Sequence, residues 1–158
     1  LANNGLKRDK VYNKDNSLFC GLFDAYQTIA SSLEKKLEES GQIHLTRTQI
    51  IILINVINGL SRGSQLAKAI GISRQAVQQQ LSELIASNIL YKKPDSGDKR
   101  ANKIEFTNKG KKVANLIQTA SALIEKDLSG IVGLGNLQTL RKLLAAKWNT
   151  AAKSNAVK

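Results

Sequence analysis

The chain has 158 residues, of which 42% are hydrophobic, and it carries 24 Lys and Arg against 12 Asp and Glu, a net charge of +12. This length suits one domain or one domain with added helices, and the hydrophobic content excludes wholesale disorder. A single cysteine excludes an internal disulfide framework. A chain this basic usually binds a polyanion.

The positive charge is concentrated in the middle of the chain. Residues 46–112 contain twelve basic and four acidic side chains, whereas residues 1–45 contain six of each. No stretch reaches the roughly 18 apolar residues that a membrane span needs, and no signal peptide is visible. We therefore expect a cytoplasmic protein with no membrane partner.

Helical spacing dominates the first half of the chain. Apolar residues from Leu18 to Leu37 recur every three or four positions, which predicts a helix over residues 17–40 that Gly41 ends. Thr46 is expected to cap a second helix that reaches residue 58. Ser61 is a candidate N-cap for a third helix, which ends at residue 70.

The third and fourth helices, joined by a tight turn at Gly71, predict a helix-turn-helix, and a hairpin follows them. Ser73 caps the fourth helix, which reaches about residue 87. Residues 89–93 and 102–106 each predict a short strand, with a Pro/Asp/Ser/Gly turn between them. Thr107 then caps a fifth helix. Three glycines, at 130, 133 and 135, are expected to loosen the chain before a last helix that includes Trp148.

These elements predict a mainly α fold with a small β-hairpin wing. The expected organisation is an arm and first dimerisation helix in residues 1–44, a winged helix-turn-helix domain in 45–110, and C-terminal dimerisation helices and tail in 111–158. The apolar stripes of the first, fifth and sixth helices have no partner within the winged domain. They favour a homodimer that shares one helical bundle; the alternative is a monomer whose terminal helices pack on its own winged domain.

The fourth helix has the composition of a recognition helix. Its polar face is expected to read bases or adjacent phosphates through Ser73, Arg74, Gln75, Gln78 and Gln79. Glutamine pairs bidentately with adenine and arginine with guanine. The alternative is a solvated polar face. Gln80 departs from the helix-turn-helix pattern, because an aliphatic core residue is usual at that position.

The hairpin has the composition of a DNA-contacting wing. Lys92, Lys93 and Lys99 are expected to meet phosphates, and Arg100 at the tip suits a narrow minor groove. Asp98 is placed to hold the Arg100 guanidinium. The alternative is a solubilising run of charge.

Together these residues resemble the MarR family of bacterial transcription regulators. The resemblance rests on Leu45–Gln49, Leu66–Val77, Asn88–Leu90, the wing tip Asp98–Arg100 and the segment Phe106–Gly110. It implies a homodimeric repressor that binds an inverted repeat, uses Arg100 in the minor groove and is released by a small ligand such as an aromatic acid or a phenol. The ligand crevice would involve the first, second and fifth helices, with His44 near it.

Other functional classes have less support in the sequence. Cys20 lies near a helix N-terminus, where thiols are reactive, and one branch of the family senses hydroperoxides through such a residue; a buried cysteine is the commoner case. A non-specific architectural DNA binder is a further alternative. One histidine and one cysteine, far apart in sequence, give no basis for an enzyme, a metal site or a cofactor.

Overall fold

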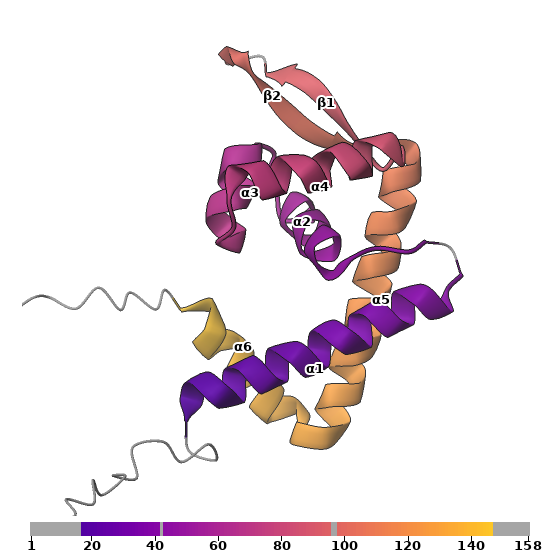
Figure 1. Cartoon of the computed structure of the whole chain (residues 1–158). Coiled ribbons are helices and arrows are strands. Elements are labelled where there is room, and N and C mark those ends of the chain that lie inside the picture. Colours follow the sequence, from indigo (N-terminus) through magenta and orange to yellow (C-terminus); the bar gives the residue numbers. More distant parts are fainter. Residues whose placement is uncertain (1–16, 42, 96–97, 147–158) are drawn as a thin grey trace, which may run out of the picture. The chain divides into compact units, whose positions relative to one another are not determined.

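The computed structural model describes residues 17–41, 43–95 and 98–146, except for the side chains of 95 and 98–101. Six helices and one two-stranded antiparallel sheet form in this part of the chain (Figure 1), so the predicted mainly α fold with a hairpin is confirmed. The chain divides into two compact units, one through Ser121 and one from Ala122. No helix in the described ranges is long and apolar enough to cross a membrane.

The first helix, α1, spans Leu18–Glu39 and begins as the sequence predicts. Ser17 caps it by accepting a hydrogen bond from the Cys20 backbone N–H at 3.4 Å. Its buried residues, Leu33 and Leu37, are both in the C-terminal half, whereas Leu22 is half-buried and Leu18 is exposed. The described residues therefore cover the predicted apolar stripe only in part.

Helix α2 spans Arg47–Ile57 and forms the centre of the first unit. Its apolar side chains Ile52 and Leu53 are completely buried. Thr46 is the N-cap, as predicted, and forms a capping box with Gln49 in which each side chain hydrogen-bonds to the other residue's backbone. This box fixes the side chain of Gln49 at the start of the helix.

Helices α3, Gly63–Ile70, and α4, Arg74–Ala86, form the helix-turn-helix. Gly71 adopts the left-handed conformation, with φ of +77°, which allows the tight turn between them. Arg62, and not Ser61, is the N-cap of α3, so the predicted cap is wrong by one residue. The Ser61 carbonyl instead accepts a hydrogen bond from the Ile104 N–H at 2.7 Å, which ties this loop to the wing.

The wing consists of β1, Leu90–Asp95, and β2, Asp98–Phe106, and it projects beyond the helices of the motif (Figure 1). Leu90 pairs with Phe106, and Lys92 pairs with Ile104. Both strands extend further toward the tip than predicted. Pro94 does not stop β1 early because each strand of a two-stranded sheet has a free edge, where the missing N–H costs nothing.

Helix α5, Asn108–Val132, starts in the first unit and ends in the second. In the second unit, α6, Leu134–Ala145, follows Gly133, whose φ is +85°. Gly130 lies inside α5 and Gly135 inside α6, so only one of the three glycines breaks the helix. Glu125 and Arg141 form an ion pair between the two helices. The predicted Trp148 lies outside the described residues.

Candidate nucleic-acid interface

Helix α4 presents a polar face to solvent because its buried apolar residues lie on the other side. Val77, Leu81 and Leu84 are at most 1% exposed and anchor α4 to the rest of the first unit. The outward positions are exposed and correspond to the predicted reading set, Ser73, Arg74, Gln75, Gln78 and Gln79. The structure thus brings these five residues to the accessible side of one helix. Their contact with DNA stays a prediction.

One member of this set also has a structural role. The Ser73 hydroxyl accepts a hydrogen bond from the Ala76 N–H at 3.1 Å and caps α4. Arg74 lines a shallow depression beside the turn together with Lys68 of α3. Lys68 was not among the predicted DNA contacts. The positive charge of Lys68 in the first helix of the motif could have indicated a DNA contact. Only the turn at Gly71, however, brings Lys68 next to Arg74.

The pleat of the wing separates the two lysines of β1. Successive side chains on a strand point to opposite faces, so Lys92 and Lys93 do not act as one patch. Lys93 Nζ lies 3.5 Å from Glu105 Oε1, and the Tyr91 hydroxyl donates a hydrogen bond to the same carboxylate. The Tyr91 hydroxyl first, and the lysine charge beside it, lower the pKa of the Glu105 carboxyl. Lys92 is exposed on the other face.

The wing tip is only partly described. The backbone of Asp98, Lys99 and Arg100 forms the start of β2, but their side chains lie outside the described residues. The predicted support of Arg100 by Asp98 therefore stays a prediction. The hairpin does place all three residues at the end of the wing farthest from the strand pair Leu90 and Phe106.

Gln80, the residue that departs from the helix-turn-helix pattern, has a polar partner. It is half-buried, and its Oε1 accepts a hydrogen bond from the Thr46 hydroxyl at 3.3 Å. One turn further along α4, Glu83 Oε2 accepts a hydrogen bond from Gln49 Nε2 at 2.8 Å. The start of α2 is thus bonded to α4 at two places, and no sequence pattern predicts either bond.

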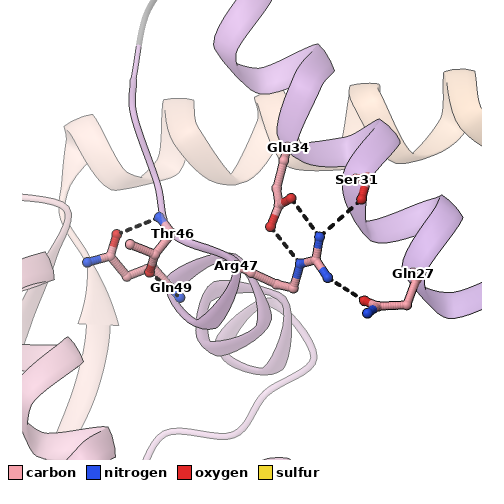
Figure 2. Close-up of polar contacts among 6 residues, drawn as sticks. All are labelled: Gln27, Ser31, Glu34, Thr46, Arg47 and Gln49. Atoms are coloured by element: carbon pink, nitrogen blue, oxygen red, sulfur yellow. Dashed lines mark hydrogen bonds and ion pairs between the residues drawn. The ribbon is translucent and has the colours of Figure 1, made fainter. Parts of the chain in front are cut away.

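Arg47 connects the same turn of α2 to α1 (Figure 2). Its guanidinium donates two hydrogen bonds to the Glu34 carboxylate, from Nε at 2.7 Å and from Nη2 at 2.8 Å. Ser31 accepts another at 3.1 Å, and Gln27 also accepts one. The hydrogen bond from Arg47 lowers the pKa of Glu34, against a smaller opposing effect of burial. The same bond raises the pKa of Arg47.

A cavity of about 100 Å³ lies between α1 and α2 beside this ion pair. Its walls are mostly aliphatic, with one aromatic ring and the stems of the ion pair; they consist of Tyr26, Ile29, Ala30, Leu33, Glu34, Arg47, Ile50, Ile51 and Ile54. The cavity is lined by α1 and α2, which are two of the three helices expected to form a ligand crevice. His44 does not line it. His44 lies at an open depression near Gly41, with Nδ1 3.6 Å from Glu38 Oε1.

Cys20 lies in the first turn of α1 and is half-buried. Its neighbours Phe19 and Phe23 are exposed, and their rings stack with centroids 6.4 Å apart. The redox role of Cys20, which the sequence raised as an alternative, stays a hypothesis.

Comparisons with known proteins agree with the fold. A sequence model of the MarR family matches residues 45–101. No curated protein has a significant sequence match to the chain. Solved structures are similar to it in fold at low sequence identity, and three of them illustrate the likeness.

The apo form of wild-type MarR from E. coli is 18% identical, with a TM-score of 0.67 over 81% of this chain and 94% of that one. The transcriptional repressor CouR, bound to a 23-mer DNA duplex, is 20% identical, with a TM-score of 0.70 over 83% and 92%. A probable transcriptional regulator from Pseudomonas aeruginosa is 19% identical, with a TM-score of 0.67 over 84% and 98%. The chain therefore has the fold of MarR-family transcription regulators, and its residues 45–101 carry the sequence pattern of that family.

Proposed function

We propose that this protein is a sequence-specific DNA-binding transcription regulator, a repressor that acts as a homodimer on an inverted repeat. The observation that carries the proposal is the outward face of α4, where arginine and three glutamines are exposed beside a left-handed glycine turn. These side chains have the hydrogen-bonding groups that read base edges in the major groove. The excess of positive charge in residues 46–112 supplies the attraction to phosphate. Action on the chromosome requires the cytoplasmic location expected from the sequence.

The exposed apolar side chains support the dimer. Near the start of α1, Leu18, Phe19 and Phe23 are each at least half exposed. On α6, Leu134, Leu143 and Leu144 are also at least half exposed. Single exposed apolar residues are normal, but runs of them on two helices mark surfaces that a partner covers. A second copy of the chain would cover them and place two recognition helices for two half-sites.

The decisive experiment is selection of bound duplexes from a random pool at near-physiological salt, with the stoichiometry measured on the selected site. We expect an inverted repeat bound by two chains, and a loss of affinity in Arg100→Ala. Binding without sequence enrichment, with affinity that falls steeply with salt, would instead support a non-specific architectural DNA binder. Absence of binding to any duplex would refute both functions.

The cavity between α1 and α2 supports release by a small neutral effector such as a phenol. Arg47, the cation in its wall, already donates to Glu34, Ser31 and Gln27. A ligand carboxylate would have to displace Glu34 or lie beside its negative charge, so a neutral aromatic ring fits this wall better than an aromatic acid.

Phenol and benzoate test this proposal directly, since they differ mainly in charge. We expect phenol to raise the thermal midpoint and weaken operator binding, and benzoate to do neither at the same concentration. Ala30→Leu should fill the cavity and remove the response to phenol. A response to benzoate alone, or a phenol response that survives Ala30→Leu, would place the effector site elsewhere.

A further inference from the structure

The first turn of α2 is bonded on one side to the recognition helix. The Gln49 side chain uses both ends of its amide: Oε1 accepts from the Thr46 N–H at 3.1 Å, and Nε2 donates to Glu83 at 2.8 Å. Gln49 is only 8% exposed, and in that setting an unpaired amide end would be costly. The amide is therefore held in one orientation and connects the backbone of α2 to α4.

Gln80 adds a second bond between the same two elements. It lies three residues before Glu83 on α4, so both side chains are on the same face of that helix. Its Oε1 accepts from the hydroxyl of Thr46, the N-cap of α2. The apolar contacts of α4 through Val77, Leu81 and Leu84 hold the helix in place without strong directionality, whereas these two hydrogen bonds depend on its rotation.

The other side of the turn is bonded to α1. Gln27, Ser31 and Glu34 recur at helical spacing along α1, and all three accept hydrogen bonds from Arg47 (Figure 2). Arg47 lies between Thr46 and Gln49 in the sequence. A displacement of α1 must therefore either break these bonds or move the turn, and a moved turn disturbs the bonds to Gln80 and Glu83.

We propose that residues 46–49 couple α1 to the recognition helix, with Arg47 and Gln49 as positioning residues that set the orientation of α4 on DNA. The link to DNA affinity rests on the function proposed above. Since Glu34 and Arg47 also line the cavity between α1 and α2, an occupant of that cavity would act on α4 through this turn. Gln80, which replaces the usual aliphatic residue, is part of the coupling.

The test on the α1 side uses Glu34→Gln, which keeps the shape of the side chain but removes its charge and one acceptor. Glu39→Gln is the matched control, because it removes the same charge from the same helix at a surface pair with Lys35. We expect Glu34→Gln to speed backbone hydrogen exchange within residues 74–86 and to weaken operator binding about threefold to tenfold. The control should change neither. Exchange that speeds up only in α1 and α2 would overturn the proposal.

The test on the α4 side uses Glu83→Ala, with Glu83→Gln as its control because glutamine keeps an acceptor for Gln49. If the turn couples the helices, Glu34→Gln should have a clearly smaller further effect on α4 exchange and on affinity in the Glu83→Ala background, where only the bond from Thr46 to Gln80 remains. In the Glu83→Gln background its effect should persist. Equal effects of Glu34→Gln in both backgrounds would mean that the two sides act independently, and would overturn the coupling.

The two measurements separate this proposal from the function on which it rests. If the unmodified protein binds no duplex, the proposed function fails, and hydrogen exchange alone decides whether the turn couples the helices. If the protein binds its operator but Glu34→Gln leaves α4 exchange unchanged, the function stands and the coupling is wrong.

Discussion

Arg47 and Glu34 form a two-point ion pair, with Nε 2.7 Å from Oε1 and Nη2 2.8 Å from Oε2, that joins the first turn of α2 to α1. Paired parallel hydrogen bonds of this kind are stronger and more specific than a single contact. Both side chains are about a quarter to a third exposed. The pair is therefore partly screened, and its main effect is on the placement of the two helices.

The ion pair makes stability depend on pH. Arg47 lowers the pKa of Glu34, so the contribution of the pair is present at neutral pH and is lost as the pH falls through that lowered pKa. We expect Glu34→Gln to reduce the free energy of unfolding at pH 7. The difference from the unmodified protein should disappear below the ordinary carboxyl range. Denaturant unfolding at a series of pH values measures it, and a difference independent of pH would contradict the assignment.

Gly110 is required by a close approach between α5 and the segment before the wing. A Cβ at this position would lie 1.9 Å from the backbone oxygen of Ile89. That oxygen also accepts from the Thr107 N–H at 3.0 Å, so it is not free to move. Gly110→Ala should lower the free energy of unfolding by about 3 kcal/mol or more.

Gly130→Ala is the control for this prediction, because it is the same substitution in the same helix. Apart from its chain neighbours and the nearby backbone of its own helix, no atom lies within 4 Å of a Cβ at position 130. The substitution should therefore be neutral or stabilising by up to about 1 kcal/mol, since alanine favours the helix more than glycine does. Equal destabilisation by the two variants would show that the close approach at Gly110 is unimportant.

The two faces of the wing should respond differently to substitution. Lys92→Ala should reduce the slope of log affinity against log salt by about 1, equally for all DNA sequences. Lys93→Ala should have a smaller effect, because Lys93 is paired with Glu105. Titrations at several salt concentrations measure both slopes. Equal reductions in the two variants would mean that the pair with Glu105 opens when DNA binds.

The glutamines of α4 should control sequence preference and leave the salt dependence unchanged. We expect Gln75→Ala combined with Gln79→Ala to weaken operator binding by about 1–3 kcal/mol per lost base contact, and non-specific binding much less. Competition between operator and random duplex measures the difference. An unchanged preference for the operator over random duplex would show that this face of α4 does not read bases.

Cys20 is expected to have no redox role in DNA binding. Its half-buried position beside exposed phenylalanines fits a small apolar residue. Treatment with organic hydroperoxide should leave operator affinity unchanged, in the unmodified protein and in Cys20→Ser alike. If peroxide releases the DNA and Cys20→Ser prevents this, the redox alternative is established instead.

Local sequence signals predicted the helices well, because caps and apolar spacing act within a few residues. Thr46 and Ser73 cap the helices that the sequence assigned to them. The third helix is the exception: Ser61 has the right residue type, but its carbonyl bonds to Ile104 of the wing and the helix starts after Arg62. Local sequence patterns do not predict a hydrogen-bond partner that lies 43 positions away in the chain.

The sequence by itself determined the helix-turn-helix, the basic hairpin and the outward polar face of α4, since these follow from periodicity, from Gly71 and from the distribution of charge. Only the tertiary structure decided the use of Gln80, the burial of Gln49, the pairing of Arg47 with Glu34 and the pairing of Lys93 with Glu105. Each of these depends on which elements meet in space. Polar side chains in particular form directional bonds with whatever partner the packing brings within about 3 Å, and no local pattern encodes that partner.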